Sequence, residues 1–90
     1  MKYRILYTSR AQKDLRKFPD TTARRIIRAI HTLGEDPYLH VKKLNGSGPD
    51  HPVYTSRIGL YHRAFLSIHD EILIVHVLEI ENRKQAYRDF

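Results

Sequence analysis

The run Ile72-Leu73-Ile74-Val75-His76-Val77-Leu78 constrains the fold more than any other segment, because it is apolar at every position but one. Apolar side chains at odd and even positions alike, most of them β-branched, predict a strand buried on both faces and therefore central in a sheet. Strand-like residues also occupy 53–58 and 61–68, and Gly59-Leu60 and His69-Asp70-Glu71 separate the three segments. Two turns this short predict an antiparallel meander of three strands.

The beginning of the chain combines a strand pattern with a helix pattern. Residues 2–8 largely alternate between apolar and polar side chains, which predicts an N-terminal strand. Ser9 is then expected to cap a helix from about Arg10 to Phe18, and Pro19 to end it.

A second helix is expected to have Asp20 or Thr21 as its N-cap and Gly34 as its C-cap, with Pro37 beyond it. Its apolar stripe consists of Ile26, Ile27, Ile30 and Leu33. The short link between the helices predicts an antiparallel helical hairpin. The expected fold is therefore α+β: an N-terminal strand, the two-helix hairpin and the meander, with the helices packed on one face of a twisted sheet. The other face is then free to carry a site.

Composition limits the class of protein. Ninety residues predict a single domain over 1–90. Sixteen Lys and Arg against ten Asp and Glu give a net charge of +6, which favours a polyanion or an acidic protein as partner, although a well-solvated basic surface has the same composition. The chain has no cysteine and no apolar run near the roughly 18 residues of a membrane span, so we expect a cytoplasmic protein without membrane association.

Metal and nucleotide sites are not indicated. The six histidines are scattered and form no H-x-x-x-H pair, so we expect no metal site. They are His31, His40, His51, His62, His69 and His76. Residues 46–49 lack the strand, helix and lysine of a phosphate-binding loop, and we expect no cofactor.

Basic and phenolic side chains in the second half could cleave RNA without a metal. Guanidinium groups hold phosphates and stabilise the charge of the transition state, and a phenol can move protons. The candidates are Arg57, Arg63, Arg83 and Tyr87, and Arg63 shares a strand face with Phe65 and Ser67. The alternative is that these arginines pair with Asp70, Glu79 and Glu81 on an ordinary solvated surface.

Five segments resemble, in order, those of the RelE-type toxins of the RelE/ParE superfamily. Arg10–Pro19 resembles their first helix, and Asp36-Pro37 with Val41–Gly46 resembles the segment after the helices. The other three are Val53–Gly59, similar to a Tyr-Arg-x-Arg-x-Gly strand; His62–Phe65, similar to an aromatic-Arg-apolar-apolar strand; and Arg83–Arg88, similar to the closing Arg-Arg-x-x-Tyr motif. The resemblance covers essentially the whole chain.

This resemblance implies the toxin of a type II toxin–antitoxin system, which a small acidic antitoxin neutralises in a hetero-oligomer. It implies a ribosome-dependent mRNA endonuclease that cuts in the ribosomal A site without a metal and so inhibits translation. By position, Arg63 would stabilise the phosphate, Arg83 would do so or protonate the leaving group, and Tyr87 would act as base or stack on RNA. Arg57 matches the second basic position of the strand motif. The expected RNA-binding residues are Lys42, Lys43, His62, Lys84 and Arg88.

Two positions depart from the family pattern: Thr55 occupies the first basic position of the strand motif, and Glu81 replaces the usual glycine before the closing motif. The arginine of the second strand is also open to two alignments. Counting forward from Gly59 selects His62, which could transfer protons or pack on the sheet. Counting back from Arg83 selects Arg63, which we prefer because no gap is needed.

Two other functions fit the same resemblance. A ParE-like toxin would poison gyrase by binding protein rather than by cutting RNA. A catalytically inactive member would serve as a DNA-binding or regulatory partner of its antitoxin, and Thr55 and Glu81 favour this reading. The retention of four residues favours the nuclease: Arg57, Arg63, Arg83 and Tyr87.

Overall fold

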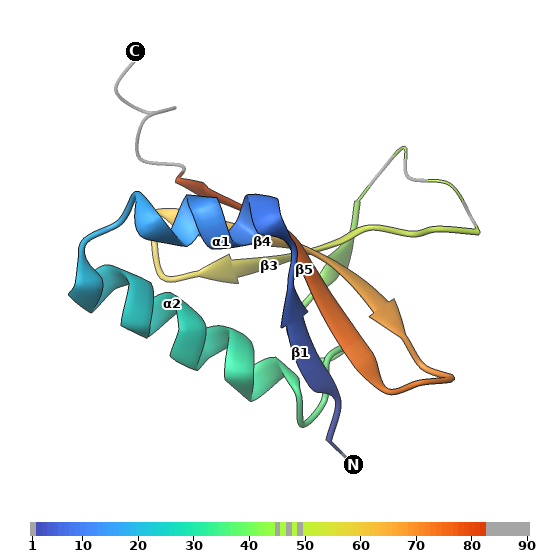
Figure 1. The fold of residues 1–90 in the computed structure, drawn as a ribbon. Coiled ribbons are helices and arrows are strands. Elements are labelled where there is room, and N and C mark those ends of the chain that lie inside the picture. Colours follow the sequence, from blue (N-terminus) through green and yellow to red (C-terminus); the bar gives the residue numbers. More distant parts are fainter. Residues whose placement is uncertain (1, 45, 47, 49, 83–90) are drawn as a thin grey trace.

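The computed structural model describes residues 2–44, 46, 48 and 50–82. The strands and helices follow one another along the chain in the predicted order, with one additional short strand, β2 (Figure 1). They are β1 (Arg4–Tyr7), α1 (Ser9–Arg16), α2 (Asp20–Leu33), β2 (Lys42–Lys43), β3 (Tyr54–Ile58), β4 (His62–His69) and β5 (Ile74–Asn82).

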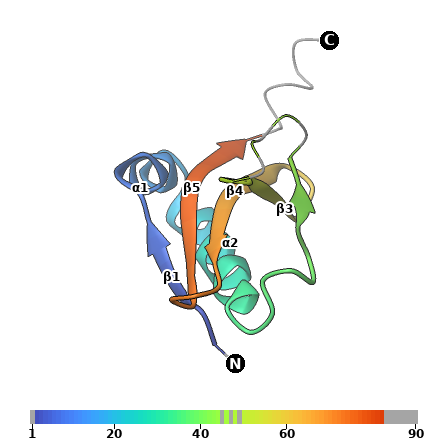
Figure 2. The same cartoon turned by 90° about the vertical axis from the view of Figure 1, so that its right-hand side faces the viewer.

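The strands form one mixed sheet in the order β1-β5-β4-β3-β2. β3, β4 and β5 pair antiparallel and so confirm the predicted meander, while β1 pairs parallel to β5. β5 therefore lies inside the sheet, between β1 and β4, as the apolar run predicts. Figure 2 shows the sheet from β1 on the left to β3 on the right, with α2 behind it.

Both helices bury their apolar stripes on the same face of the sheet. Ala11 of α1 and Ile26, Ile30 and Leu33 of α2 are at most 3% exposed. From the sheet, the core receives Ile58, Ala64, Leu66, Val75, Val77 and Ile80. The predicted α+β architecture, with the helices on one face, is confirmed, and the two helices run in opposite directions (Figure 1).

The helix starts differ from the predicted caps. Thr8, not Ser9, caps α1: its hydroxyl oxygen accepts a hydrogen bond from the Ala11 amide at 3.0 Å. α2 begins at Asp20 after Pro19, without a side-chain cap. Gly34 ends α2 as predicted, but with a helical φ of −61°. Glycine is needed there because an added Cβ would lie 2.9 Å from the Tyr3 carbonyl oxygen.

A β-bulge at Leu78 determines which side chains of β5 face the core. The register of β4 shifts between Phe65, which pairs with Glu79, and Leu66, which pairs with Val77. One extra residue changes the alternation, so that Val77 and Ile80 both face the helices. Without this shift Glu79 would follow Val77 onto the core face, whereas the bulge turns it to the open face.

The chain before and within α1 holds this bulge in place. The Thr8 hydroxyl donates to the carbonyl oxygen of Leu78 at 2.7 Å, and the Thr8 amide donates to that of Val77 at 3.0 Å. The buried carboxylate of Asp14 accepts a hydrogen bond from the Ile80 amide at 3.0 Å. Thr8 and Asp14 thus form the hydrogen bonds of three backbone groups at the bulge: the carbonyls of Val77 and Leu78 and the amide of Ile80.

Two expectations about the strands were wrong in detail. β5 begins at Ile74, not Ile72, because residues 70–73 form the turn; Leu73 has a φ of +54° and Ile72 is 62% exposed. Only one face of β5 is fully buried, since α1 and α2 both pack on that face. The sequence patterns also gave no sign of the short strand β2, in which Lys42 and Lys43 pair with Thr55 and Tyr54 of β3.

Candidate nucleic-acid interface

The meander places two arginines side by side on the open face of the sheet. Arg57 of β3 lies directly opposite Arg63 of β4, and Thr55 lies opposite Phe65. On the other side of β4, Arg63 lies opposite Glu81. Side chains two residues apart on a strand share a face, so Arg63, Phe65 and Ser67 project together as predicted.

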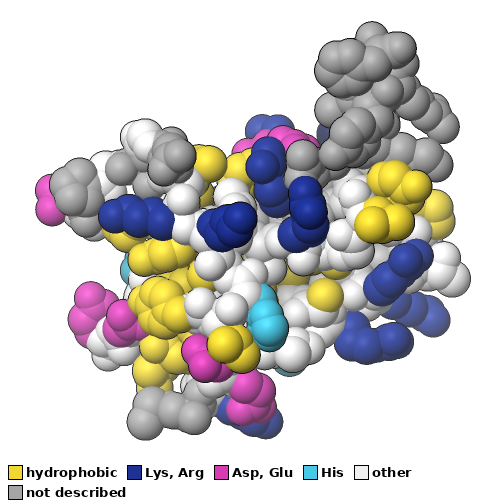
Figure 3. All heavy atoms as spheres, turned by 180° about the vertical axis from the view of Figure 1, so that it is seen from behind, with side chains coloured by type: hydrophobic (Ala, Val, Ile, Leu, Met, Phe, Trp, Pro, Cys, Tyr) yellow, Lys and Arg dark blue, Asp and Glu magenta, His cyan; other side chains and the backbone are white. Residues whose placement is uncertain are grey.

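A cationic hollow of about 310 Å³ opens on this face. Its lining residues come from the segment after α2 and from three strands: His40, Lys42, Thr55, Arg57 and Arg63. Three of the five side chains are permanently charged cations, and none is a carboxylate. In Figure 3 several Lys and Arg side chains gather across the middle of the view, with a histidine below them. Such a concave cationic surface suits a phosphate group.

Arg63 is the most constrained cation of this hollow. Its side chain is 31% exposed, and its Nη2 atom lies 3.1 Å from Glu81 Oε1. The guanidinium also lies over the Phe65 ring, 4.9 Å from the centroid, in a cation–π contact. Its Nε is buried and has no hydrogen-bond partner within the described part of the chain. Strand, ring and carboxylate therefore fix the group at the edge of the hollow.

The structure brings together three of the predicted site residues: Lys42, Arg57 and Arg63. Lys43 is exposed but pairs with Tyr54, one position out of alternation with Lys42, and is not part of the hollow. The predicted residues Arg83, Lys84, Tyr87 and Arg88 lie outside the described residues.

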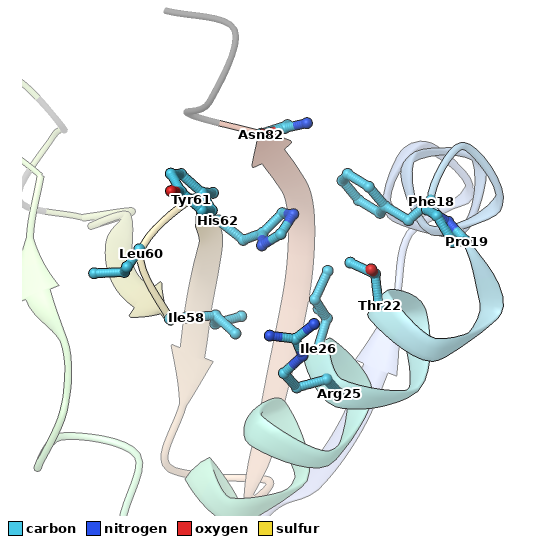
Figure 4. Close-up of a pocket in the computed structure, with 11 residues that line it drawn as sticks. Phe18, Pro19, Thr22, Arg25, Ile26, Ile58, Leu60, Tyr61, His62 and Asn82 are labelled. Carbon is cyan, nitrogen blue, oxygen red and sulfur yellow. The ribbon is translucent and has the colours of Figure 1, made fainter. Parts of the chain in front are cut away.

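His62 lies on the helix face of the sheet rather than with Arg63. Its ring contacts the Phe18 ring edge-on, with centroids 5.0 Å apart, and Figure 4 shows it in a pocket with Thr22 and Arg25. Burial, and secondly the nearby Arg25, lower the pKa of His62 below its ordinary 6.5. The packing role considered for His62 therefore fits its position, and the alignment that selects Arg63 places the arginine on the open face.

The alternative of an ordinary ion-paired surface holds only in part. Glu81 pairs with Arg63, but Glu79 pairs with Arg10 of α1 at 3.2 Å. Asp70 binds no arginine among the described residues; it accepts hydrogen bonds from the hydroxyls of Tyr3 at 2.7 Å and Tyr38 at 2.8 Å.

His40 was missed by the sequence reasoning. It follows α2 in a segment without periodicity, and only the fold brings it into the same hollow as Arg57. Thr55, which replaces a basic family residue, lines the same hollow, so the departure from the pattern removes one positive charge there. Within the described ranges no group of three or more His, Asp or Glu side chains could hold a metal ion.

Comparison with known proteins identifies the family of this chain. The family model described as the ParE toxin of the type II toxin–antitoxin system parDE matches residues 5–87. The chain belongs to the RelE/ParE superfamily of type II toxins. A curated superfamily relative from Methanocaldococcus jannaschii, designated RelE1, is 28% identical over 93 residues, which cover 99% of each chain.

Solved structures of RelE/ParE toxins share the fold. The chain is 26% identical to one in the archaeal RelE–RelB complex from Pyrococcus horikoshii, with a TM-score of 0.75, covering 92% of this chain and 97% of that one. It is 25% identical to one in the toxin–antitoxin complex RelBE2 from Mycobacterium tuberculosis, with a TM-score of 0.80, covering 92% and 100%. In the described part of this RelE/ParE toxin, no helix is long and apolar enough to cross a membrane.

Proposed function

We propose that this toxin is a ribosome-dependent mRNA endonuclease that cuts in the ribosomal A site and thereby inhibits translation in the cytoplasm. The observation that carries the proposal is the cationic hollow of Lys42, Arg57 and Arg63 on the uncovered face of the sheet. RNA presents a phosphate at every nucleotide, and fixed guanidinium groups bind phosphates with two parallel hydrogen bonds.

The side chains suit cleavage without a metal. In attack by a 2′-hydroxyl, negative charge builds up on the phosphate oxygens, and Arg63 and Arg57 would stabilise it. A base must take the 2′ proton and an acid must protonate the leaving oxygen. Tyr87 and Arg83 are the proposed groups, and Arg83 follows directly after Asn82, the last residue of β5. The reaction is a transesterification: the 2′-oxygen forms a bond to phosphorus as the bond to the 5′-oxygen breaks. It leaves a cyclic phosphate and a 5′-hydroxyl.

The contact between Glu81 and Arg63 has to break when RNA binds. The carboxylate contacts Nη2, one of the donors that a phosphate would use. The pair is partly exposed, and such pairs contribute about 0–1 kcal/mol, so exchange of a carboxylate for a phosphate costs little. Lys42, Lys84 and Arg88 are the proposed further RNA-binding residues.

The proposed partner outside the ribosome is a cognate antitoxin, small and acidic, that forms a hetero-oligomer with the toxin. Structural relatives of this chain were solved as complexes of RelE with RelB, which supports an antitoxin of that kind. The net charge of +6 favours an acidic partner.

The test is inducible expression followed by mapping of mRNA ends on translating ribosomes. New ends within A-site codons are expected for the wild type, and Arg63→Ala, Arg83→Ala and Tyr87→Phe should abolish them. Arg24→Ala is the matched control, because Arg24 is an exposed arginine of α2 on the other side of the sheet. Growth arrest without new mRNA ends would contradict the proposal.

A second candidate is a ParE-like gyrase poison, favoured by the match to the ParE family model over residues 5–87. DNA breaks or gyrase arrest on expression, with intact mRNA, would select it. Absence of any growth defect would instead indicate an inactive member, in line with Thr55 in the hollow and Glu81 on Arg63.

A further inference from the structure

A second hollow, of about 410 Å³, opens further along β4. It lies between the end of that strand and the segment that precedes β3. Its lining includes Asp50, Pro52, Ser67, His69, Glu71 and the bulged Leu78. Among the described residues no Lys or Arg lines it, so it differs from the cationic hollow in charge as well as in place.

The polar wall of this second hollow is organised by a hydrogen bond between side chains. Ser67 Oγ lies 3.0 Å from His69 Nε2, and both residues are half-buried. They are alternate residues of β4 and share its open face with Arg63 and Phe65. The bond holds the imidazole in one orientation and leaves Nδ1 of His69 for another partner.

The lining suits a flat ring with polar edges. Pro52 and Leu78 supply apolar surface, Ser67 and His69 both donate and accept hydrogen bonds, and carboxylates accept only. Asp50 and Glu71 would repel a phosphate here, but they can accept hydrogen bonds from an amino group. A nucleobase has this combination of an apolar face and a polar edge.

We propose that this hollow is a nucleobase subsite, in which Ser67, His69 and the carboxylates of Asp50 and Glu71 select bases with an exocyclic amino group over uracil. The inference rests on the proposed function, since it extends the RNA path from the cationic hollow. Arg63 and Ser67 are four residues apart on β4, or about 13 Å. Phe65 lies half-buried between them, with the Arg63 guanidinium over its ring.

Fluorescence anisotropy with short single-stranded RNAs tests the subsite. The probes are labelled uridine hexamers that carry one guanosine, cytidine or adenosine at each position in turn. At one position, an amino-bearing base should raise the affinity of the wild type at least about fivefold over the all-uridine probe. Ser67→Ala and His69→Phe should remove this preference, so that the amino-bearing probes bind no more tightly than the all-uridine probe.

Ser9→Ala and His31→Phe are matched controls, because they remove a hydroxyl and an imidazole from exposed positions of α1 and α2. Both should keep the preference. Equal affinity of the wild type for all probes, or a preference that survives both β4 variants, would overturn the subsite alone. Failure of the wild type to bind any probe better than Arg63→Ala would overturn the proposed RNA function itself.

Discussion

Arg63 and Glu81 lie directly opposite each other on β4 and β5, and the Arg63 Nη2 atom is 3.1 Å from Glu81 Oε1. The contact depends on the bulge at Leu78, because the bulge moves the later residues of β5 from one face of the sheet to the other. The carboxylate therefore occupies the place at which a phosphate would compete for the same guanidinium. The open face thus combines a cationic hollow with a carboxylate that competes with phosphate for Arg63.

Glu81→Gln should raise the affinity for single-stranded RNA about fivefold, since it removes one like charge that repels a phosphate at about 4 Å. Anisotropy titrations at several salt concentrations measure the effect, which should shrink as salt screens the charge. Glu35→Gln is the matched control, because Glu35 pairs with Lys2 at 3.4 Å rather than with a residue of the hollow. A fall in affinity for Glu81→Gln would mean that the carboxylate orients Arg63 for binding.

Asp14→Ala should lower the free energy of unfolding by about 1–3 kcal/mol, because the Ile80 amide would lose its buried acceptor. Asp14→Asn keeps an acceptor oxygen and should lose less. Urea unfolding measures both, with the midpoint and the slope fitted separately. Equal losses for the two variants would show that the charge of Asp14, which also faces Arg10 Nε at 3.5 Å, matters more than the hydrogen bond.

The sequence predicts the local elements well, because the patterns of 53–58 and of α2 report directly which side chains are buried. The bulge is not predictable in this way, since it depends on a hydrogen bond that Thr8 donates and one that Asp14 accepts, and both residues are far away in sequence. The left-handed Leu73 has no sequence signal either.

The same distinction applies to the site. Arg57 and Arg63 follow from strand parity, whereas the contribution of His40 depends on the path of the chain after α2. Lys42 and Lys43 look equivalent in sequence, and only their pairing with β3 separates them.

His62→Phe should make stability less sensitive to mild acid. Burial, and then Arg25, lower the pKa of His62 in the folded protein below 6.5, so below that pH the unfolded chain binds the proton more readily. Stability is therefore lost as pH falls from about 6.5 through the lowered pKa of the folded state. Phenylalanine retains a ring against Phe18 but cannot be protonated. Urea unfolding at pH 7.5 and 5.0 compares the two proteins, and an unchanged pH dependence would contradict the assignment.

Asp70 joins the β4–β5 turn to two tyrosines, one near the N-terminus and one after α2. The hydroxyls of Tyr3 and Tyr38 donate to its carboxylate, and these bonds, that of Tyr3 first, lower the Asp70 pKa below 3.8. The carboxylate is exposed, so the effect on stability should be small.

The sign of this contribution follows from the lowered pKa. It is present above pH 3.8 and is lost as pH falls through the lower value of the folded state. Asp70→Asn keeps an acceptor oxygen but has no charge to titrate, so the difference in urea midpoint between wild type and variant should shrink below pH 3.8.

Amide hydrogen exchange at Tyr3, whose N–H donates to the Gly34 carbonyl at 2.7 Å, reports whether Asp70→Ala loosens β1. An unchanged exchange rate would show that backbone pairing with β5 holds β1 in place without the hydrogen bonds from Tyr3 and Tyr38 to Asp70.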